Sequence, residues 1–320
     1  MPSLQTVADS SMERRKVNRL VTPPLTSRAD APNMRAMNVN MWDTLFNLVL
    51  LLFWSAMFTR DEREWAANPF LVNVARLQRG TVGFIQPVLP FLGRRMVALG
   101  CLLFLLLFRG FVLPANAEWG LQLGFTGARF QPGTVLTRLM FSVVSFALFL
   151  FKLWGVSLIY VHRTREAGFR PSSDALSKLA RPFTDLAVRF RPAALLALGM
   201  LLAYALSAIG RPLNPGAGLP LVVLGARSFI LALSGWVAVL QIVQSCLLLM
   251  IIGSWVSMFT GAHGLAHFCR EWIDLLVGPI RRYPLRIGML DLTPLVFLIG
   301  IGFLHDLLQG ILFNSFRAVA

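Results

Sequence analysis

The stretch Gly278–Pro294, GPIRRYPLRIGMLDLTP, decides the fold of this chain, because it joins an amphipathic run to a long apolar run. It packs three prolines, three arginines, two glycines and one aspartate into seventeen residues. Pro279 ends the preceding helix, since proline lacks an amide hydrogen and disfavours helix in the residue before it. Asp291 is predicted to cap the next helix, and Pro294 falls in its first turn, where a missing donor costs nothing. The stretch predicts a joint between two helices at a membrane surface.

The rest of the chain is unusually apolar. Of its 320 residues 56% are hydrophobic and 14% are charged, whereas a soluble domain carries about a quarter charged residues. The charge is confined to short stretches between apolar blocks, as in membrane proteins. Six blocks are long enough to cross a ~30 Å hydrocarbon layer, and a lipid-exposed backbone must then be helical. We predict an all-α membrane protein with about six transmembrane helices, at 41–58, 96–113, 134–161, 193–209, 229–259 and 292–313.

The six spans pair into three helical hairpins. Each hairpin loop is preceded by a tryptophan and contains a proline, at Trp54, Trp154 and Trp255 and at Pro87, Pro182 and Pro279. The tryptophans are 100 and 101 residues apart and the prolines 95 and 97. Two markers with a shared period indicate a triplicated unit; chance placement is the alternative. We assign residues 1–40 to a polar mobile tail and the hairpins to 41–113, 134–209 and 226–313.

Each hairpin loop also carries an amphipathic run. In the third loop, apolar residues between Leu265 and Leu276 share one helical face. In the second, apolar residues from Leu176 to Phe190 recur at spacings of three and four. In the first, Asn68 and Pro69 predict a helix start, followed by Phe70, Val74 and Leu77 on one face. Such helices lie in the membrane interface with arginines toward the headgroups, or they pack on the helical bundle, and the sequence leaves both open.

The basic residues predict how the chain is oriented. The net charge is +15, and 27 of the 30 basic residues are arginine. They flank the apolar blocks, which indicates a membrane surface and no nucleic-acid partner. The three hairpin loops hold 17 lysines and arginines, and the two connecting loops hold three. By the positive-inside rule the hairpin loops face the cytoplasm, or the equivalent side of an organelle; the N-terminal tail, with six basic residues, points the other way.

Ionisable groups inside the spans are costly and therefore informative. Arg109, Lys152, His305 and Asp306 are such groups. Lys152 is expected to extend toward the inner interface. Arg109 and Asp306 each lie about 20 Å from the inner face at ~1.5 Å per residue, so they are candidates for an intramembrane ion pair. The alternative is that both reach the outer interface.

Catalytic patterns are missing from the sequence. It contains no phosphate-binding loop, dinucleotide fingerprint, HExxH helix or nucleophile elbow. The cysteines at 101, 246 and 269 have no metal-ligand spacing, and His263 and His267 lack further ligands nearby. We expect no enzymatic activity, no metal and no cofactor.

The opening stretch resembles the signature of the YggT family, called YlmG-type in plastids and Gram-positive bacteria. In this family a basic turn between prolines is followed by a glycine and by an Asp-Leu/Ile-Ser/Thr-Pro sequence that opens a transmembrane helix. The matching residues are Pro279, Arg281, Arg282, Pro284, Gly288, Asp291, Leu292, Thr293 and Pro294, within a similarity that covers 245–312. The first two hairpins keep prolines and arginines of the pattern but lack the aspartate, so they are degenerate copies.

The resemblance implies an integral protein of bacterial inner membranes or plastid membranes, with no enzymatic activity or cofactor. Family members are associated with cell-envelope, division or membrane-complex assembly contexts. We predict a scaffold or assembly factor of the bacterial inner membrane; a plastid or mitochondrial membrane is the alternative location. Its basic turns would hold anionic lipid or a membrane-protein partner through Arg94, Arg95, Arg189, Arg191, Arg281, Arg282 and Arg286. The alternative function is an ion or solute channel or transporter, for example an osmotic one.

Overall fold

The computed structural model describes residues 34–58, 72–88, 91, 93–112, 119–130, 134–164, 171–209, 221–260, 269–274, 277, 285–287 and 290–319. The chain divides into two compact units, residues 1–41 and residues 42–320. The first contributes only the start of one helix to the described part. All contacts below belong to the second unit.

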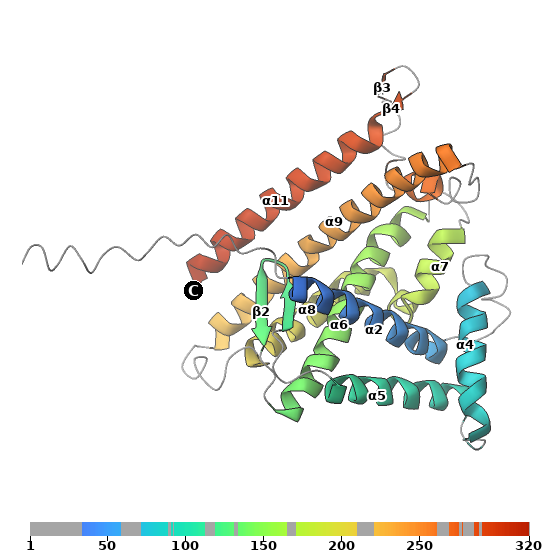
Figure 1. Cartoon of the computed structure of the whole chain (residues 1–320). Coiled ribbons are helices and arrows are strands. Elements are labelled where there is room, and N and C mark those ends of the chain that lie inside the picture. The colour runs from blue at the N-terminus through green and yellow to red at the C-terminus, as the bar shows by residue number, and fades with distance from the viewer. Residues whose placement is uncertain are drawn as a thin grey trace, which may run out of the picture. The chain divides into compact units, whose positions relative to one another are not determined.

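The described part is built mainly of helices (Figure 1). The first half contains α2 (Met34–Phe58), α4 (Val72–Ile85), η1 (Gln86–Val88), α5 (Arg94–Val112), the strands β1 (Trp119–Leu123) and β2 (Thr126–Phe130), and α6 (Val135–Thr164). The second half contains α7 (Pro171–Leu179), η2 (Phe183–Asp185), η3 (Val188–Phe190), α8 (Arg191–Ile209), α9 (Leu221–Thr260), β3 (Arg286–Ile287), β4 (Leu290–Asp291) and α11 (Thr293–Val319).

Within the described residues, five helical stretches are long and apolar enough to cross a membrane, namely Arg94–Val112, Val135–Tyr160, Val188–Leu206, Val222–Val256 and Thr293–Val319. The first predicted span corresponds to a shorter apolar segment, Trp42–Phe58. The predicted class, an all-α membrane protein, is confirmed, and the only strands described are two short ribbons. The chain is a multi-pass membrane protein.

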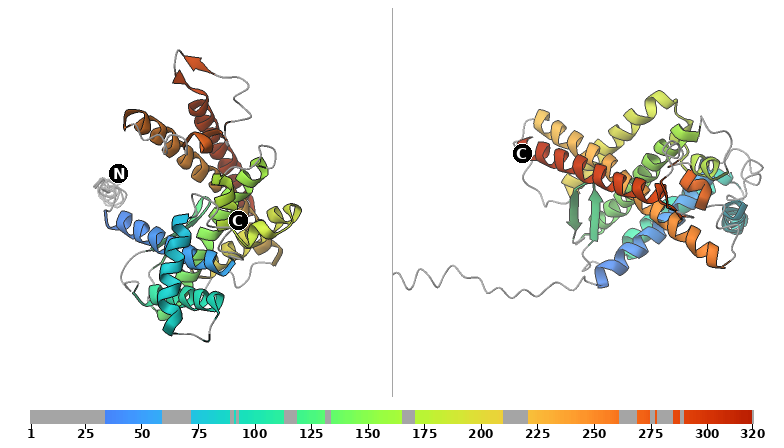
Figure 2. Two further views of the ribbon diagram at one scale, coloured as in Figure 1. Left: turned by 90° about the vertical axis from the view of Figure 1, so that its right-hand side faces the viewer. Right: turned by 90° about the horizontal axis from the view of Figure 1, so that it is seen from above.

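Helix α6 lies between two hydrophobic cores. On one side Leu150 of α6 joins Leu50 of α2, Val82 of α4 and Leu102 of α5. On the other side its Tyr160 joins a cluster drawn from α7, α9 and α11. The helices pack in the order α5, α6, α8, α9, α11, and Figure 2 shows α9 and α11 side by side in both views. Each long helix thus buries a stripe against its neighbours and leaves the rest of its surface apolar and exposed, as lipid requires.

A glycine lets α8 and α9 approach closely. A Cβ at Gly199 would lie 3.0 Å from Cβ of Ala232 and 3.1 Å from a ring carbon of Phe151. Small residues at helix crossings are the usual means of packing membrane helices, because the backbones can then come together.

The ribbon β1–β2 was not predicted. Its strands pair antiparallel with Leu123 opposite Thr126, and Gly124 at the tip has φ +60°, a conformation that glycine adopts without strain. Leu121 and Leu123 are buried and Gln122 is exposed. The tip lies against Ser234 and Gly235 of α9. The connection between α5 and α6 therefore reaches across to the third hairpin.

The first amphipathic run buries a face of α4 that includes a polar side chain. α4 begins at Val72 and buries Ala75, Gln78 and Val82, whereas Leu77 is 60% exposed. At Leu77 the predicted apolar face therefore does not pack on the helical bundle, and the polar Gln78 is buried there. Its side chain donates to the Ser55 hydroxyl at 2.8 Å and to the Leu52 carbonyl at 3.2 Å. The predicted cap at Asn68 and Pro69 lies outside the described residues.

The second run is not one helix. α7 ends at Leu179, and two 3-10 turns follow, so Leu186 and Phe190 are exposed. Pro182 explains the break, since it has no amide hydrogen to continue the helix.

The third run packs on the bundle over its described part. Residues 269–274 are helical, with Cys269 and Ile273 buried and Arg270 exposed. The Trp272 ring meets the Tyr160 ring edge-on, with centroids 4.6 Å apart. Of the two alternatives left open by the sequence, burial against protein holds here.

Candidate functional site

A buried arginine joins the first hairpin to α6. Arg109, one turn from the end of α5, is 1% exposed. Its guanidinium forms an ion pair with Asp43 of α2. Nη1 donates to the Asn47 side-chain oxygen at 3.0 Å, and Nη2 donates to the Ser145 hydroxyl, also at 3.0 Å. We call Asp43, Asn47, Arg109 and Ser145 the arginine network.

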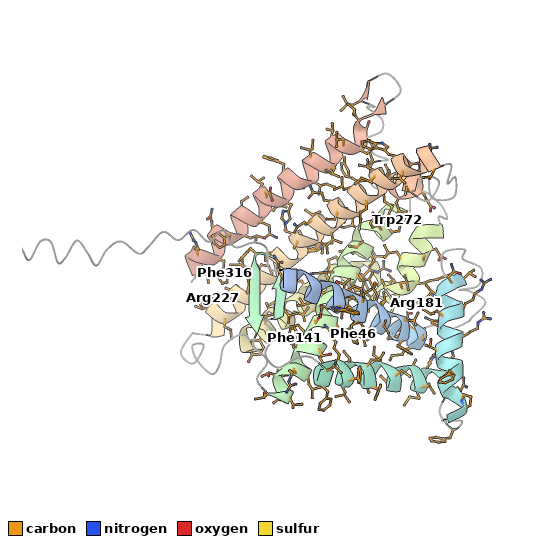
Figure 3. All side chains as sticks on the ribbon, viewed as in Figure 1. Phe46, Phe141, Arg181, Arg227, Trp272 and Phe316 are labelled. Carbon is orange, nitrogen blue, oxygen red and sulfur yellow. The ribbon has the colours of Figure 1, made fainter. Side chains whose placement is uncertain are left out.

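The network is closed on itself. The Ser145 hydroxyl donates to Oδ2 of Asp43 at 2.9 Å, and the Asn47 amide donates to the same oxygen at 3.3 Å. The face of the Phe141 ring lies 5.9 Å from the guanidinium carbon of Arg109, and Figure 3 labels Phe141 in this region. A charge removed from water is tolerated when it is paired and its donors are satisfied. The arrangement can hold three helices in register.

The predicted pair of Arg109 and Asp306 does not form. Arg109 pairs with Asp43, while the side chain of Asp306 is 83% exposed and its Oδ1 lies 2.9 Å from Nδ1 of His305. The reason is the packing order, which places α5 against α6 and α11 against α9. Asp43 and Asn47 are four residues apart and so share a helical face, but this spacing does not point to Arg109 as their partner.

Two of the three regularly spaced tryptophans contact the same turn. Trp54 at the end of α2 donates its indole hydrogen to the Arg181 carbonyl at 2.8 Å. Trp154 of α6 stacks on Phe183, with centroids 5.2 Å apart and planes 7° apart. Both tryptophans thus hold the turn around Pro182, near the labelled Arg181 of Figure 3.

Arg191 is part of this turn and is not available at the surface. It is 8% exposed, and its guanidinium donates to the carbonyls of Leu186 at 3.0 Å and Thr184 at 2.5 Å. The prediction that Arg191 binds lipid or a partner is therefore corrected to a structural role, because its donors close the turn that leads into α8.

Other predicted arginines and exposed phenylalanines lie close together in the sequence at the starts of α5 and α8. Arg95 is exposed in the first turn of α5, Arg94 is partly buried, and Phe91 just before them is 80% exposed. Arg189 is exposed, and its guanidinium lies 4.7 Å from the ring centre of Phe190, which is 54% exposed. A cation in the first turn opposes the helix dipole. An anion at these helix starts would remove that conflict.

The signature stretch forms a second ribbon and then a helix. In the antiparallel β3–β4 ladder the backbone of Arg286 lies opposite that of Asp291, and the backbone of Ile287 opposite that of Leu290. The Thr293 hydroxyl, 1% exposed, accepts from the Leu285 amide at 3.1 Å, and the Leu292 amide donates to the Leu285 carbonyl at 2.9 Å. Thr293 thereby ties the turn to the start of α11.

Of the predicted signature residues that the structure describes, some lie where they were expected, while the roles of others stay predictions. Pro294 is buried in the first turn of α11, as expected. Asp291 lies in β4, two residues before the helix, and its capping role stays a prediction, as does the binding role of Arg286. The remaining predicted residues, Pro279, Arg281, Arg282, Pro284 and Gly288, lie outside the described residues.

Among the described residues, no group of three or more His, Cys, Asp or Glu could hold a metal ion. The three cysteines are free thiols. Burial raises the pKa of the Cys269 thiol, which keeps it protonated and unreactive near neutral pH. His263 and His267 lie outside the described residues.

Comparison with known proteins finds a family for part of the chain. Residues 229–312 match the family model CCB3/YggT. This segment contains most of α9, the signature stretch and α11 as far as Leu312. No curated protein and no solved structure matches the chain. The predicted resemblance is confirmed for this segment, and the protein is a multi-pass membrane protein whose residues 229–312 match the CCB3/YggT family model.

Proposed function

We propose that this protein is a non-enzymatic scaffold or assembly factor that holds anionic lipid headgroups at the starts of its returning helices. The observation that carries the proposal is an exposed arginine within four residues of an exposed phenylalanine at the starts of both α5 and α8, Arg95 with Phe91 and Arg189 with Phe190; the Arg189 guanidinium lies over the Phe190 ring. A phenylalanine inserted among acyl chains places the neighbouring guanidinium at the level of the phosphates.

Electrostatics supports an anionic ligand. Each arginine near an anionic membrane surface contributes about 1 kcal/mol to its attraction. A phosphate at the N-terminal end of a helix also interacts favourably with the unpaired amide groups there. The arginines of the signature stretch occupy the corresponding loop of the third hairpin, so we assign them the same role. By the positive-inside rule this surface is the cytoplasmic one, which suits a bacterial inner membrane.

The test is retention of anionic lipid by the purified full chain. The protein is reconstituted with equal phosphatidylglycerol and phosphatidylethanolamine, re-extracted gently, and examined by native mass spectrometry. The double variant Arg95→Gln, Arg189→Gln should lower the affinity for phosphatidylglycerol about tenfold or more, since two attractions of ~1 kcal/mol are lost. Lys178→Gln is the control, because Lys178 is 14% exposed and already paired with Asp174 at 3.0 Å. Unchanged retention in the double variant would refute the lipid role.

The second candidate function, a channel or transporter, draws on the arginine network as an intramembrane charged site. The arginine network favours a structural role in holding α2, α5 and α6 together, because its polar groups bond to one another. Leu50, Leu102 and Leu150, farther along the same three helices, are 0–6% exposed in one hydrophobic cluster. In proteoliposomes the scaffold predicts solute and ion flux equal to that of empty vesicles. Flux above that of empty vesicles would favour the transporter.

A further inference from the structure

One face of α11 has no neighbour among the described residues. The helix packs on α9 through its other side, where Ile301 is buried and Gln309 donates to the Ser234 carbonyl at 2.9 Å. Figure 1 shows α11 beside α9 at the edge of the bundle. The uncovered face carries residues at alternating spacings of three and four, and we call it the α11 seam: Val296, Ile299, Phe303, Asp306 and Gly310.

The seam has a carboxylate at its centre. Asp306 is the fourteenth residue of a 27-residue apolar helix, which places it near the middle of the membrane. Among the described residues, the contact found for its side chain is that of Oδ1 with Nδ1 of the adjacent His305, and 83% of the side chain is exposed. Charged groups at this depth normally face protein and not lipid, because an unpaired charge in hydrocarbon is costly.

The shape of the seam suits a helix. Alternating spacings of three and four place these residues along one line that a second helix can follow. At Gly310 an added Cβ would meet nothing within 4 Å, so a partner backbone can approach closely there. Phe303 is 71% exposed and Ile299 61% exposed. They supply apolar surface on the N-terminal side of Asp306, whereas Gly310 lies on its C-terminal side.

We infer that the α11 seam docks a transmembrane helix of another membrane protein, and that this helix carries a lysine or arginine at mid-depth. A cation is the group that complements a mid-membrane carboxylate. A second copy of this chain is a poor occupant. Because Asp306 is central in α11, parallel and antiparallel pairing would each bring two carboxylates together. Arg109 is already paired within the arginine network. The inference goes beyond the proposed lipid role and uses a different surface.

The experiment uses the full chain in vesicles and defined model helices. The probes are two peptides of about 20 leucines and alanines, identical except for a central lysine or leucine, each with one cysteine beside that position. The three native cysteines of the protein are replaced by alanine, and Leu307→Cys, next to Asp306, supplies the reactive group. The control site is Leu249→Cys on α9, since Leu249 is 64% exposed to the same lipid. Disulfide crosslinking rates are measured.

The lysine peptide should crosslink to Leu307→Cys at least about fivefold faster than the leucine peptide, and the two should be equal at Leu249→Cys. Asp306→Asn should abolish the preference without changing the melting temperature, and Asp306→Lys should transfer it to a peptide with a central aspartate. Equal rates for the two peptides, or a preference that survives Asp306→Asn, would overturn the inference. Faster crosslinking between two copies of the chain would assign the seam to self-association instead. Neither result depends on Arg95 and Arg189, so the lipid proposal is judged separately.

Discussion

At the scale of single residues, Arg109 is the side chain whose loss should matter most. Its guanidinium is 1% exposed, and it is the only described cation that bonds to Asp43, Asn47 and Ser145 together. Arg109→Leu leaves the Asp43 carboxylate inside the bundle without its cation. Breaking a buried pair from one side costs about 3–5 kcal/mol. We expect a loss of this size in the free energy of unfolding, measured by denaturation in mixed micelles.

The control is Arg95→Leu, which removes an exposed arginine from the same helix and should change stability by less than about 1 kcal/mol. The double variant Asp43→Leu, Arg109→Leu should recover much of the loss, because no charge is then left unpaired. If Arg109→Leu were as stable as Arg95→Leu, the arginine network would not hold these helices together.

The sequence predicted that Arg109 is unusual but not which residue it pairs with. Arg109 could be singled out because a cation inside an apolar span is conspicuous. Its partner could not, since Asp43 lies at the edge of the first span and Ser145 is 36 residues farther along the chain than Arg109. Only the packing of α2, α5 and α6 brings them together. Asp306 was recognised by the same signal, and its pairing with Arg109 was wrong for the same reason.

At the scale of elements, the ribbon β1–β2 attaches the first half of the chain to the segment that matches the CCB3/YggT family model. Phe125 at its tip meets Phe313 and Phe316 of α11, with ring centroids 5.5 and 5.7 Å apart. Figure 3 labels Phe316 beside Arg227, whose guanidinium carbon lies 5.9 Å from its ring centre. The alternation of Leu121, Gln122 and Leu123 before Gly124 is typical of a strand and turn, a short signal that the neighbouring apolar spans conceal.

Gly124→Val should detach this ribbon. Gly124 has φ +60°, where a β-branched residue is strained, and a Cβ would collide with the Ser234 side chain and lie 2.6 Å from its carbonyl carbon. We expect a loss of more than about 2 kcal/mol and a melting temperature lower by several degrees, followed by tryptophan fluorescence. Gly120→Val is the matched control in the same ribbon, because nothing lies within 4 Å of a Cβ there. Equal melting temperatures for the two variants would contradict the fastening role.

Helices were predictable from sequence where a long apolar run is present. They were less predictable where contacts with neighbouring helices decide which face is buried and where the helix ends. The apolar runs of α5, α6, α8, α9 and α11 exceed what any soluble element needs, so their length alone identified them. The amphipathic runs were less certain. In α4 the bonds of Gln78 to Ser55 and Leu52 bury a polar side chain while Leu77 stays exposed, and at Pro182 the helix expected to continue to Phe190 breaks into turns.

At the scale of the whole molecule, orientation decides whether the proposed lipid surface meets the anionic leaflet. The hairpin loops hold 17 basic residues and the connecting loops three, which predicts that Arg95 and Arg189 face the cytoplasm. The cytoplasmic leaflet carries the negative surface potential that would attract them. An inverted chain would remove the electrostatic basis of the proposal while leaving the fold unchanged.

Thiol labelling on intact bacterial cells tests this orientation. In a variant with Cys101, Cys246 and Cys269 replaced by alanine, single cysteines are placed at two exposed positions on opposite sides, Thr134→Cys before α6 and Ala187→Cys before α8. A membrane-impermeant maleimide should label Thr134→Cys on intact cells and Ala187→Cys only after permeabilisation, since α6 crosses the membrane between them. The reverse pattern would show that the six basic residues of the N-terminal tail outweigh the loops, and Arg95 and Arg189 would then face the outer leaflet.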